Sequence, residues 1–294
     1  MDALQRLRAW YAEELQLVAN LQSEALVAAF AAVPRERFLD GGPWQIWTTV
    51  SPRDPFQPQA GYRTTPDANP AHVYHNVAIA LDAGRRLNTG QPATVAAWLD
   101  WLAVEPGMTV YHVGTGSGYY TAILAHLVGP HGRIVGVEVD PPLARRAQAA
   151  LAEYRQVTVV ERSAAGFDPG AVDAIFVSAG LTHPPAAWVD HLRAGGRMLL
   201  PLTFSLEGSA IGGGGVLAIQ RHATQTEARF LPGPVLFYSA ADLRTAEANR
   251  RLGHAFARGR TETVRSFRRS DHAEDDTCWL HLPDGCLSTR VGEA

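Results

Sequence analysis

The stretch Val110-Tyr111-His112-Val113-Gly114-Thr115-Gly116-Ser117-Gly118-Tyr119-Tyr120 decides which fold the sequence predicts. A short apolar run leads into three alternate glycines, and the apolar residues at 123, 124 and 127 then follow helical spacing. A second apolar run, residues 134–139, contains an acid near its end. This pattern indicates strand, loop, helix and strand. Glycine suits the loop because a backbone without Cβ can turn sharply and leave its N–H groups open to a ligand.

The acid near the end of the second run, Glu138, is expected at the carboxyl end of the neighbouring parallel strand. A carboxylate there can accept hydrogen bonds from both hydroxyls of a ribose, so the unit is predicted to bind a nucleoside. The dinucleotide fingerprint G-x-G-x-x-G does not fit, because residue 119 is Tyr and Gly118 comes one residue early. A nicotinamide cofactor and a glycine turn without a ligand remain the alternatives.

The spacing G-x-G-x-G with a ribose acid resembles the first motif of class I S-adenosylmethionine (SAM) methyltransferases. The resemblance implies that the cofactor is SAM and that its binding residues are Gly114, Thr115, Gly116, Ser117, Gly118, Tyr119 and Glu138.

The composition excludes several classes of function. All 26 basic side chains are Arg, which rules out pyridoxal-phosphate Schiff bases, the P-loop phosphate grip and the kinase ATP lysine. The net charge is −3 and the arginines are scattered, so no nucleic-acid partner is expected. With two cysteines, no signal-like segment and no long apolar run, we expect a cytoplasmic protein without a disulfide framework or a membrane partner.

Along the chain, three parts are predicted. Residues 1–85 hold an amphipathic helix or helix pair from Leu4 to Phe30, then an aromatic and proline-rich loop expected to pack over the site. Residues 86–237 form the core, where strands and helices alternate from 93 to 202 and predict an α/β fold with a doubly wound, mostly parallel sheet. Residues 238–294 form a C-terminal extension.

Two local features receive structural interpretations. The glycine cluster at 212–215 precedes a strand and no helix, so a flexible hairpin is favoured over a phosphate loop. His272, Cys278, His281 and Cys286 offer zinc-type ligands, but their spacing fits no common zinc motif. We therefore expect a small hairpin docked on the core, and no metal.

Four blocks resemble the protein-L-isoaspartate O-methyltransferase family over roughly residues 30 to 235. They are Val33-Pro34-Arg35-Glu36-Arg37-Phe38, Gly90-Gln91-Pro92, Val113-Gly114-Thr115-Gly116-Ser117-Gly118-Tyr119 and Leu192-Arg193-Ala194-Gly195-Gly196-Arg197-Met198-Leu199-Leu200-Pro201. The resemblance implies a Rossmann-like class I methyltransferase fold, SAM as the cofactor, and a peptide, protein or small-molecule carboxylate as the methyl acceptor.

The chain departs from the family pattern at three places. Gly90 stands where the family usually has a serine beside the methyl-accepting carboxylate, His112 replaces the acid before the glycine loop, and Glu161-Arg162-Ser163 replaces a Gly-Asp-Gly turn. The hydroxyl of Thr89 and the amides of Asn88 and Gln91 are then the candidate donors to the acceptor. His183 follows the fourth core strand and could act as a base or position a carboxylate.

Three functions are weighed. The first is SAM-dependent O-methylation of a carboxylate, either an isoaspartyl side chain or an acid of a dedicated peptide or metabolite. A carboxylate is already anionic near neutral pH, so the reaction needs positioning and hydrogen-bond donors more than a general base. The others are a SAM-binding protein without catalysis, motivated by Gly90, and a nicotinamide-dependent oxidoreductase, supported by the glycine loop and Glu138 alone.

Overall fold

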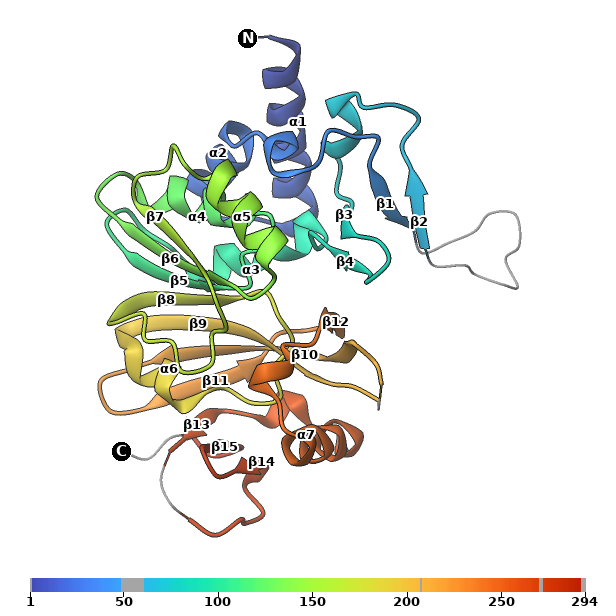
Figure 1. Ribbon diagram of the computed structural model, residues 1–294. Helices are drawn as coiled ribbons and strands as arrows, with labels where there is room; N and C mark the ends of the chain where they lie inside the picture. The colour runs from blue at the N-terminus through green and yellow to red at the C-terminus, as the bar shows by residue number, and fades with distance from the viewer. Residues whose placement is uncertain (1, 49–60, 207, 270–271, 292–294) are drawn as a thin grey trace. The chain divides into compact units, whose positions relative to one another are not determined.

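The computed structural model describes residues 2–48, 61–206, 208–269 and 272–291. The chain forms two compact units (Figure 1). The first comprises residues 1–107, 115–132 and 140–159, and the second comprises residues 108–114, 133–139 and 160–294. The domain boundaries expected at residues 86 and 238 stay a prediction.

The first unit is mainly helical. Its elements are α1 (Ala3–Ala19), α2 (Glu24–Ala32), the 3-10 helix η1 (Arg35–Phe38), β1 (Gln45–Thr48), β2 (Gly61–Thr64), η2 (Pro70–Val73), β3 (Ala80–Asp82), β4 (Leu87–Asn88), α3 (Pro92–Leu102), α4 (Tyr119–Val128) and α5 (Pro141–Ala150). The predicted N-terminal helix is a pair, because Asn20 ends α1 in the left-handed conformation and Ser23 caps α2.

The loop predicted between residues 41 and 72 contains regular structure where it is described. β1 and β2 pair antiparallel, and the rings of Trp47 and Tyr62 meet edge to face with centroids 5.1 Å apart. The prediction of a loop is wrong there, because cross-strand contacts such as this aromatic pair stabilise two strands of only four residues each. Residues 49–60, which include Pro52, Pro55, Phe56 and Pro58, lie outside the described residues. The expected packing of this loop over the site stays a prediction.

The second unit holds a mixed sheet. Its elements are β5 (Thr109–Val113), β6 (Arg133–Glu138), β8 (Val172–Val177), α6 (Ala186–His191), β9 (Leu192–Phe204), β10 (Ile211–Arg221), β11 (Thr226–Phe230), β12 (Val235–Tyr238), η3 (Ala241–Leu243), α7 (Ala246–Arg258), η4 (Thr261–Thr263), β13 (Ser266–Arg268), β14 (Cys278–Leu282) and β15 (Gly285–Ser288). β7 (Val157–Glu161) begins in the first unit and ends in the second.

The strand order is β14-β15-β13-β11-β10-β9-β8-β5-β6-β7, with β12 also paired to β10. The four strands β9, β8, β5 and β6 run parallel to one another. The later strands add antiparallel pairs beyond β9. The predicted α/β class with a parallel core is confirmed, and the later strands extend the sheet beyond β9.

The glycine cluster at 212–215 lies within β10, which pairs antiparallel with β9, so a hairpin is present but the glycines belong to its strand and not to a flexible turn. Gly213 to Gly215 pair with β9, and a Cβ at Gly214 would lie 2.0 Å from the carbonyl oxygen of Leu202. Glycine occurs here because two backbones approach closely, which is a recognised reason for glycine inside a strand. The predicted C-terminal hairpin is confirmed as β14–β15, which joins the sheet through β13.

Candidate functional site

The carboxyl ends of three parallel strands meet at one edge of the second unit's sheet. Val113 of β5 is in register with Val137 of β6 and with Val177 of β8. Gly114, Glu138 and Ser178, which follow these three residues, therefore lie side by side. The chain proceeds from β5 to one side and later returns to β8 on the other, so this edge is the topological switch point at which open α/β sheets bind ligands.

Glu138 is a buried acid at this edge, with 7% of its surface exposed. Its carbonyl oxygen accepts a hydrogen bond from the backbone N–H of Arg162 at 2.9 Å. The strand therefore holds Glu138 by its backbone at the end of β6. A carboxylate in this position can accept hydrogen bonds from a polyhydroxylated ligand, as the sequence predicts.

The glycine loop needs each of its glycines. Gly114, Gly116 and Gly118 have φ values of 75°, 56° and 93°, a region that L residues rarely adopt. A Cβ at Gly118 would also lie 2.9 Å from Leu151 Cδ1 and 3.4 Å from Ala147 Cα, so a side chain there would displace Leu151. Gly118 is the N-cap of α4, so the first N–H groups of this helix follow the loop directly.

The loop's side chains differ in what they offer a ligand. Thr115 and Ser117 are buried, and the hydroxyl oxygen of Thr115 has no hydrogen-bond partner among the described residues. Because buried polar atoms are normally satisfied, this hydroxyl fits a bound polar ligand. The ring of Tyr119 packs instead against Phe30, Phe38 and Tyr120 within the first unit, so its backbone is the part suited to a ligand.

Arg35 organises the residues around Thr89 in the first unit. Its guanidinium is fully buried and donates to the carbonyl oxygens of Val73 (2.7 Å), His75 (3.0 Å) and Val77 (2.8 Å). It also donates to the hydroxyl of Thr89 at 3.3 Å. This arginine therefore gives the first block of the family resemblance a structural role. The sequence gives no local sign of this role, because the three carbonyls come from a segment about forty residues away.

Thr89, Gly90 and Gln91 form the segment predicted to meet the methyl acceptor, and they connect β4 to α3. The Thr89 hydroxyl donates to the carbonyl of Gly90 at 3.1 Å and accepts from the N–H of Ile79 at 3.1 Å. Gly90 has a φ of 71°, so the family's serine would be strained on this backbone. Gln91 is exposed, and as N-cap of α3 its side chain makes no cap hydrogen bond. The side-chain amide of Gln91 is therefore better placed to meet a ligand than the hydroxyl of Thr89, which already forms hydrogen bonds within the protein.

His183 lies in the second unit beside the C-terminal hairpin. Its Nδ1 is 3.0 Å from the hydroxyl of Thr182, and its Nε2 is 3.7 Å from a carboxylate oxygen of Asp284. Burial lowers the pKa of His183, and the nearby Asp284 partly offsets this effect. The imidazole is therefore neutral near pH 7 and can accept a proton or a hydrogen bond.

His112, which replaces the family's acid, is buried inside the sheet. Its ring stacks on Phe176 with centroids 5.0 Å apart, and its Nε2 is 3.2 Å from the hydroxyl of Ser178. Burial lowers the pKa of His112 to about 3, so it is neutral under physiological conditions.

A family model for protein-L-isoaspartate(D-aspartate) O-methyltransferase matches residues 61–209. A protein-L-isoaspartate O-methyltransferase of Pectobacterium carotovorum is 32% identical over 223 residues, which are 72% of this chain and 89% of that protein. The chain belongs to this family. Protein-L-isoaspartate O-methyltransferase 1 of Cupriavidus necator is 38% identical over 141 residues, 47% of this chain. The chain spans about half the length of that relative, 52%, and the same share of one from Thermotoga maritima.

Solved structures support the fold of this family. The structure of a protein-L-isoaspartate O-methyltransferase superposes with a TM-score of 0.60 and 21% sequence identity. The matched region includes 87% of this chain and 71% of that protein. A structure from Plasmodium falciparum, described as a complex with S-adenosyl-L-homocysteine, covers 80% of this chain and is covered to 98%, with a TM-score of 0.59 and 16% identity. Both likenesses show that the fold is that of the family.

In the described part of the chain, no helix combines the length and the apolar character needed to cross a bilayer. The cytoplasmic location expected from the sequence stays a prediction.

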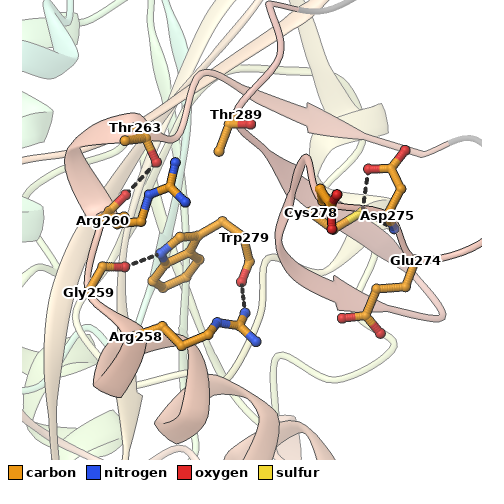
Figure 2. A pocket seen from close by; sticks show the side chains of 10 residues that line it. Arg258, Gly259, Arg260, Thr263, Glu274, Asp275, Cys278, Trp279 and Thr289 are labelled. Carbon is orange, nitrogen blue, oxygen red and sulfur yellow. Dashed lines mark hydrogen bonds between the residues drawn. The ribbon is translucent and has the colours of Figure 1, made fainter.

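A pocket of about 380 Å³ lies in the C-terminal part of the second unit (Figure 2). It contains none of the predicted site residues and is lined by residues 258–260, 263, 274–276, 278, 279 and 289.

Proposed function

We propose that this chain binds SAM and methylates a carboxylate of a peptide or protein. Family membership supports the reaction class, and the feature that carries the cofactor assignment is the glycine loop with Glu138 at the adjacent strand end. The three positive φ values and the buried Thr115 hydroxyl suit a loop that wraps around a ligand. The tyrosine at position 119 argues against a dinucleotide, whose fingerprint requires glycine there.

In this proposal each element of the site has one task. The amides of residues 114–118 and the start of α4 hold the amino-acid part of SAM, and Glu138 accepts hydrogen bonds from its ribose. Bound SAM supplies a methyl group on a sulfonium, an already activated carbon. The chain's own contribution is to hold the acceptor carboxylate in line and to exclude water.

The acceptor side of the site needs donors rather than a base. Of the candidates Thr89, Gln91 and His183, we favour the side-chain amide of Gln91 as the donor, because the Thr89 proton is engaged by the Gly90 carbonyl. We assign Thr89 a positioning role through its bonds to Arg35 and Ile79. Neutral His183 can donate or accept one hydrogen bond to the acceptor, according to its tautomer.

Incubation with methyl-labelled SAM and an isoaspartyl peptide tests this function. We expect base-labile methyl esters on the isoaspartyl peptide, and none on the same peptide with an ordinary aspartyl residue. The matched aspartyl peptide controls for non-specific esterification. Labelling of neither peptide by a protein that binds S-adenosylhomocysteine would reject the repair function, and would favour a dedicated acceptor or a SAM-binding protein without catalysis. Binding of NADH instead would reject the cofactor assignment.

A further inference from the structure

Four potential metal ligands converge in the C-terminal part of the second unit. They are His272, Cys278, His281 and Cys286, called here the Cys–His cluster. One ligand atom from each residue lies within 4.8 Å of the ligand atoms of all the others. The cluster lies outside residues 61–209, the part matched by the family model. Neither the glycine loop nor the acceptor region uses these residues.

The β14–β15 hairpin assembles three of the four ligands. His281 is directly opposite Cys286 in the antiparallel register. In a regular strand Cys278 and His281, three residues apart, would point to opposite faces. The register shifts between Cys278 and Leu280, and a β-bulge of this kind re-aims a side chain. Cys278 consequently reaches His281, and His272 joins from the segment before β14.

Two distances between ligand atoms match the edges of a tetrahedral site. The Sγ of Cys278 lies 3.5 Å from His272 Nε2 and 3.7 Å from His281 Nδ1. Zinc bonds of about 2.3 Å to sulfur and about 2.0–2.1 Å to nitrogen, at tetrahedral angles, place a sulfur and a nitrogen ligand about 3.6 Å apart. The rings of His272 and His281 are nearly perpendicular, with an angle of 84°, so they approach each other without stacking.

The surroundings suit an enclosed ion with access from one side. Cys286 is fully buried, whereas Cys278 is partly exposed and lines the pocket shown in Figure 2. The Cys278 sulfur accepts a backbone N–H bond from Asp275 at 3.5 Å. It also lies 3.6 Å from the Asp275 carboxylate, which the Thr277 N–H already contacts at 2.8 Å. Both cysteines are free thiols.

We propose that the Cys–His cluster binds one zinc ion as a structural site. A set of two thiolates and two imidazoles is the Cys2His2 type, and four protein ligands leave no open position for catalysis. Two thiolates neutralise the charge of a divalent ion, which favours binding in a half-buried place. The ion would fix the hairpin whose turn carries Asp284, the carboxylate beside His183.

Metal analysis of the protein, produced without a histidine tag and without chelators, tests this site. We expect about one zinc per chain in the unmodified protein. Cys278→Ser and His272→Ala, at positions that are not fully buried, should lower the content to background. His254→Ala changes an exposed histidine of α7 and should retain the metal. Zinc that persists in both cluster variants would overturn the assignment.

Cobalt provides a readout that does not depend on metal carried through purification. Titration of the metal-free protein with Co²⁺ should give the intense visible bands of a tetrahedral ion and a thiolate charge-transfer band, at one equivalent. Cys278→Ser should weaken the charge-transfer band, and circular dichroism checks that the variant is folded. Absence of these bands in the unmodified protein, with both thiols reactive or joined in a disulfide by mass, would refute the proposal.

Discussion

Replacing Arg35 by Met is expected to lower the free energy of unfolding by about 3–5 kcal/mol. The change leaves the carbonyls of Val73, His75 and Val77 without their buried donor, and each unsatisfied group costs about 1–3 kcal/mol. The Arg35 guanidinium also lies over the rings of Tyr11 and Tyr119, so packing is lost together with hydrogen bonds. Urea denaturation followed by circular dichroism measures the change.

Arg37 provides the matched control for this prediction. It lies in the same 3-10 helix and forms an ion pair with Glu153 at 2.9 Å, but both side chains are substantially exposed. Arg37→Met should therefore cost at most about 1 kcal/mol. Equal losses for the two variants would contradict the role given to Arg35.

The stability of the protein should fall as the pH is lowered from about 6.5 toward 3, because His112 is buried in its neutral form. Its folded-state pKa of about 3 lies below the ordinary value near 6.5, so the unfolded chain binds more protons in this range. The stabilising contribution is complete above about pH 6.5 and is lost on acidification. The free energy of unfolding changes by up to about 1.4 kcal/mol per pH unit, which amounts to about 2 kcal/mol between pH 6.5 and 4.5.

Denaturation midpoints measured at several pH values check this dependence. His112→Phe removes the titrating group while keeping a ring against Phe176, and should flatten the profile between pH 6.5 and 4.5. His126→Asn, at an exposed position of α4, serves as the control and should retain the unmodified slope. A profile for His112→Phe as steep as that of the unmodified protein would show that other groups cause the acid sensitivity.

The parallel core could be predicted because its signals are local. The apolar run 110–113 ends at Gly114 and the run 134–137 ends at Glu138, and Pro92 and Pro141 stand at the starts of α3 and α5. The same dependence on local signals explains why the glycines at 212–215 were expected in a flexible hairpin and not inside a strand. Glycine normally signals a turn, and only the pairing with β9 reveals that the residues are needed for close backbone contact.

Residues brought together by long-range contacts could not be found from spacing. Arg35 is one case, since its acceptors are backbone carbonyls and leave no trace in the sequence. The Cys–His cluster is another, because the strand register and a bulge, not a C-x-x-C spacing, place its ligands together. The positions of Gly114 and Glu138 at neighbouring strand ends could be predicted, since they follow the two parallel strands of one βαβ unit. Their role in binding SAM stays a prediction.

Calorimetric titration with S-adenosylhomocysteine tests the central claim most directly. We expect saturable binding of one equivalent to the unmodified protein. Glu138→Gln should weaken it roughly 10- to 100-fold, since hydrogen bonds to a charged group contribute about 1.5–3 kcal/mol. Glu13→Gln, an exposed acid of α1, should bind like the unmodified protein. Absence of binding to the unmodified protein, or an unchanged affinity in folded Glu138→Gln, would contradict the account.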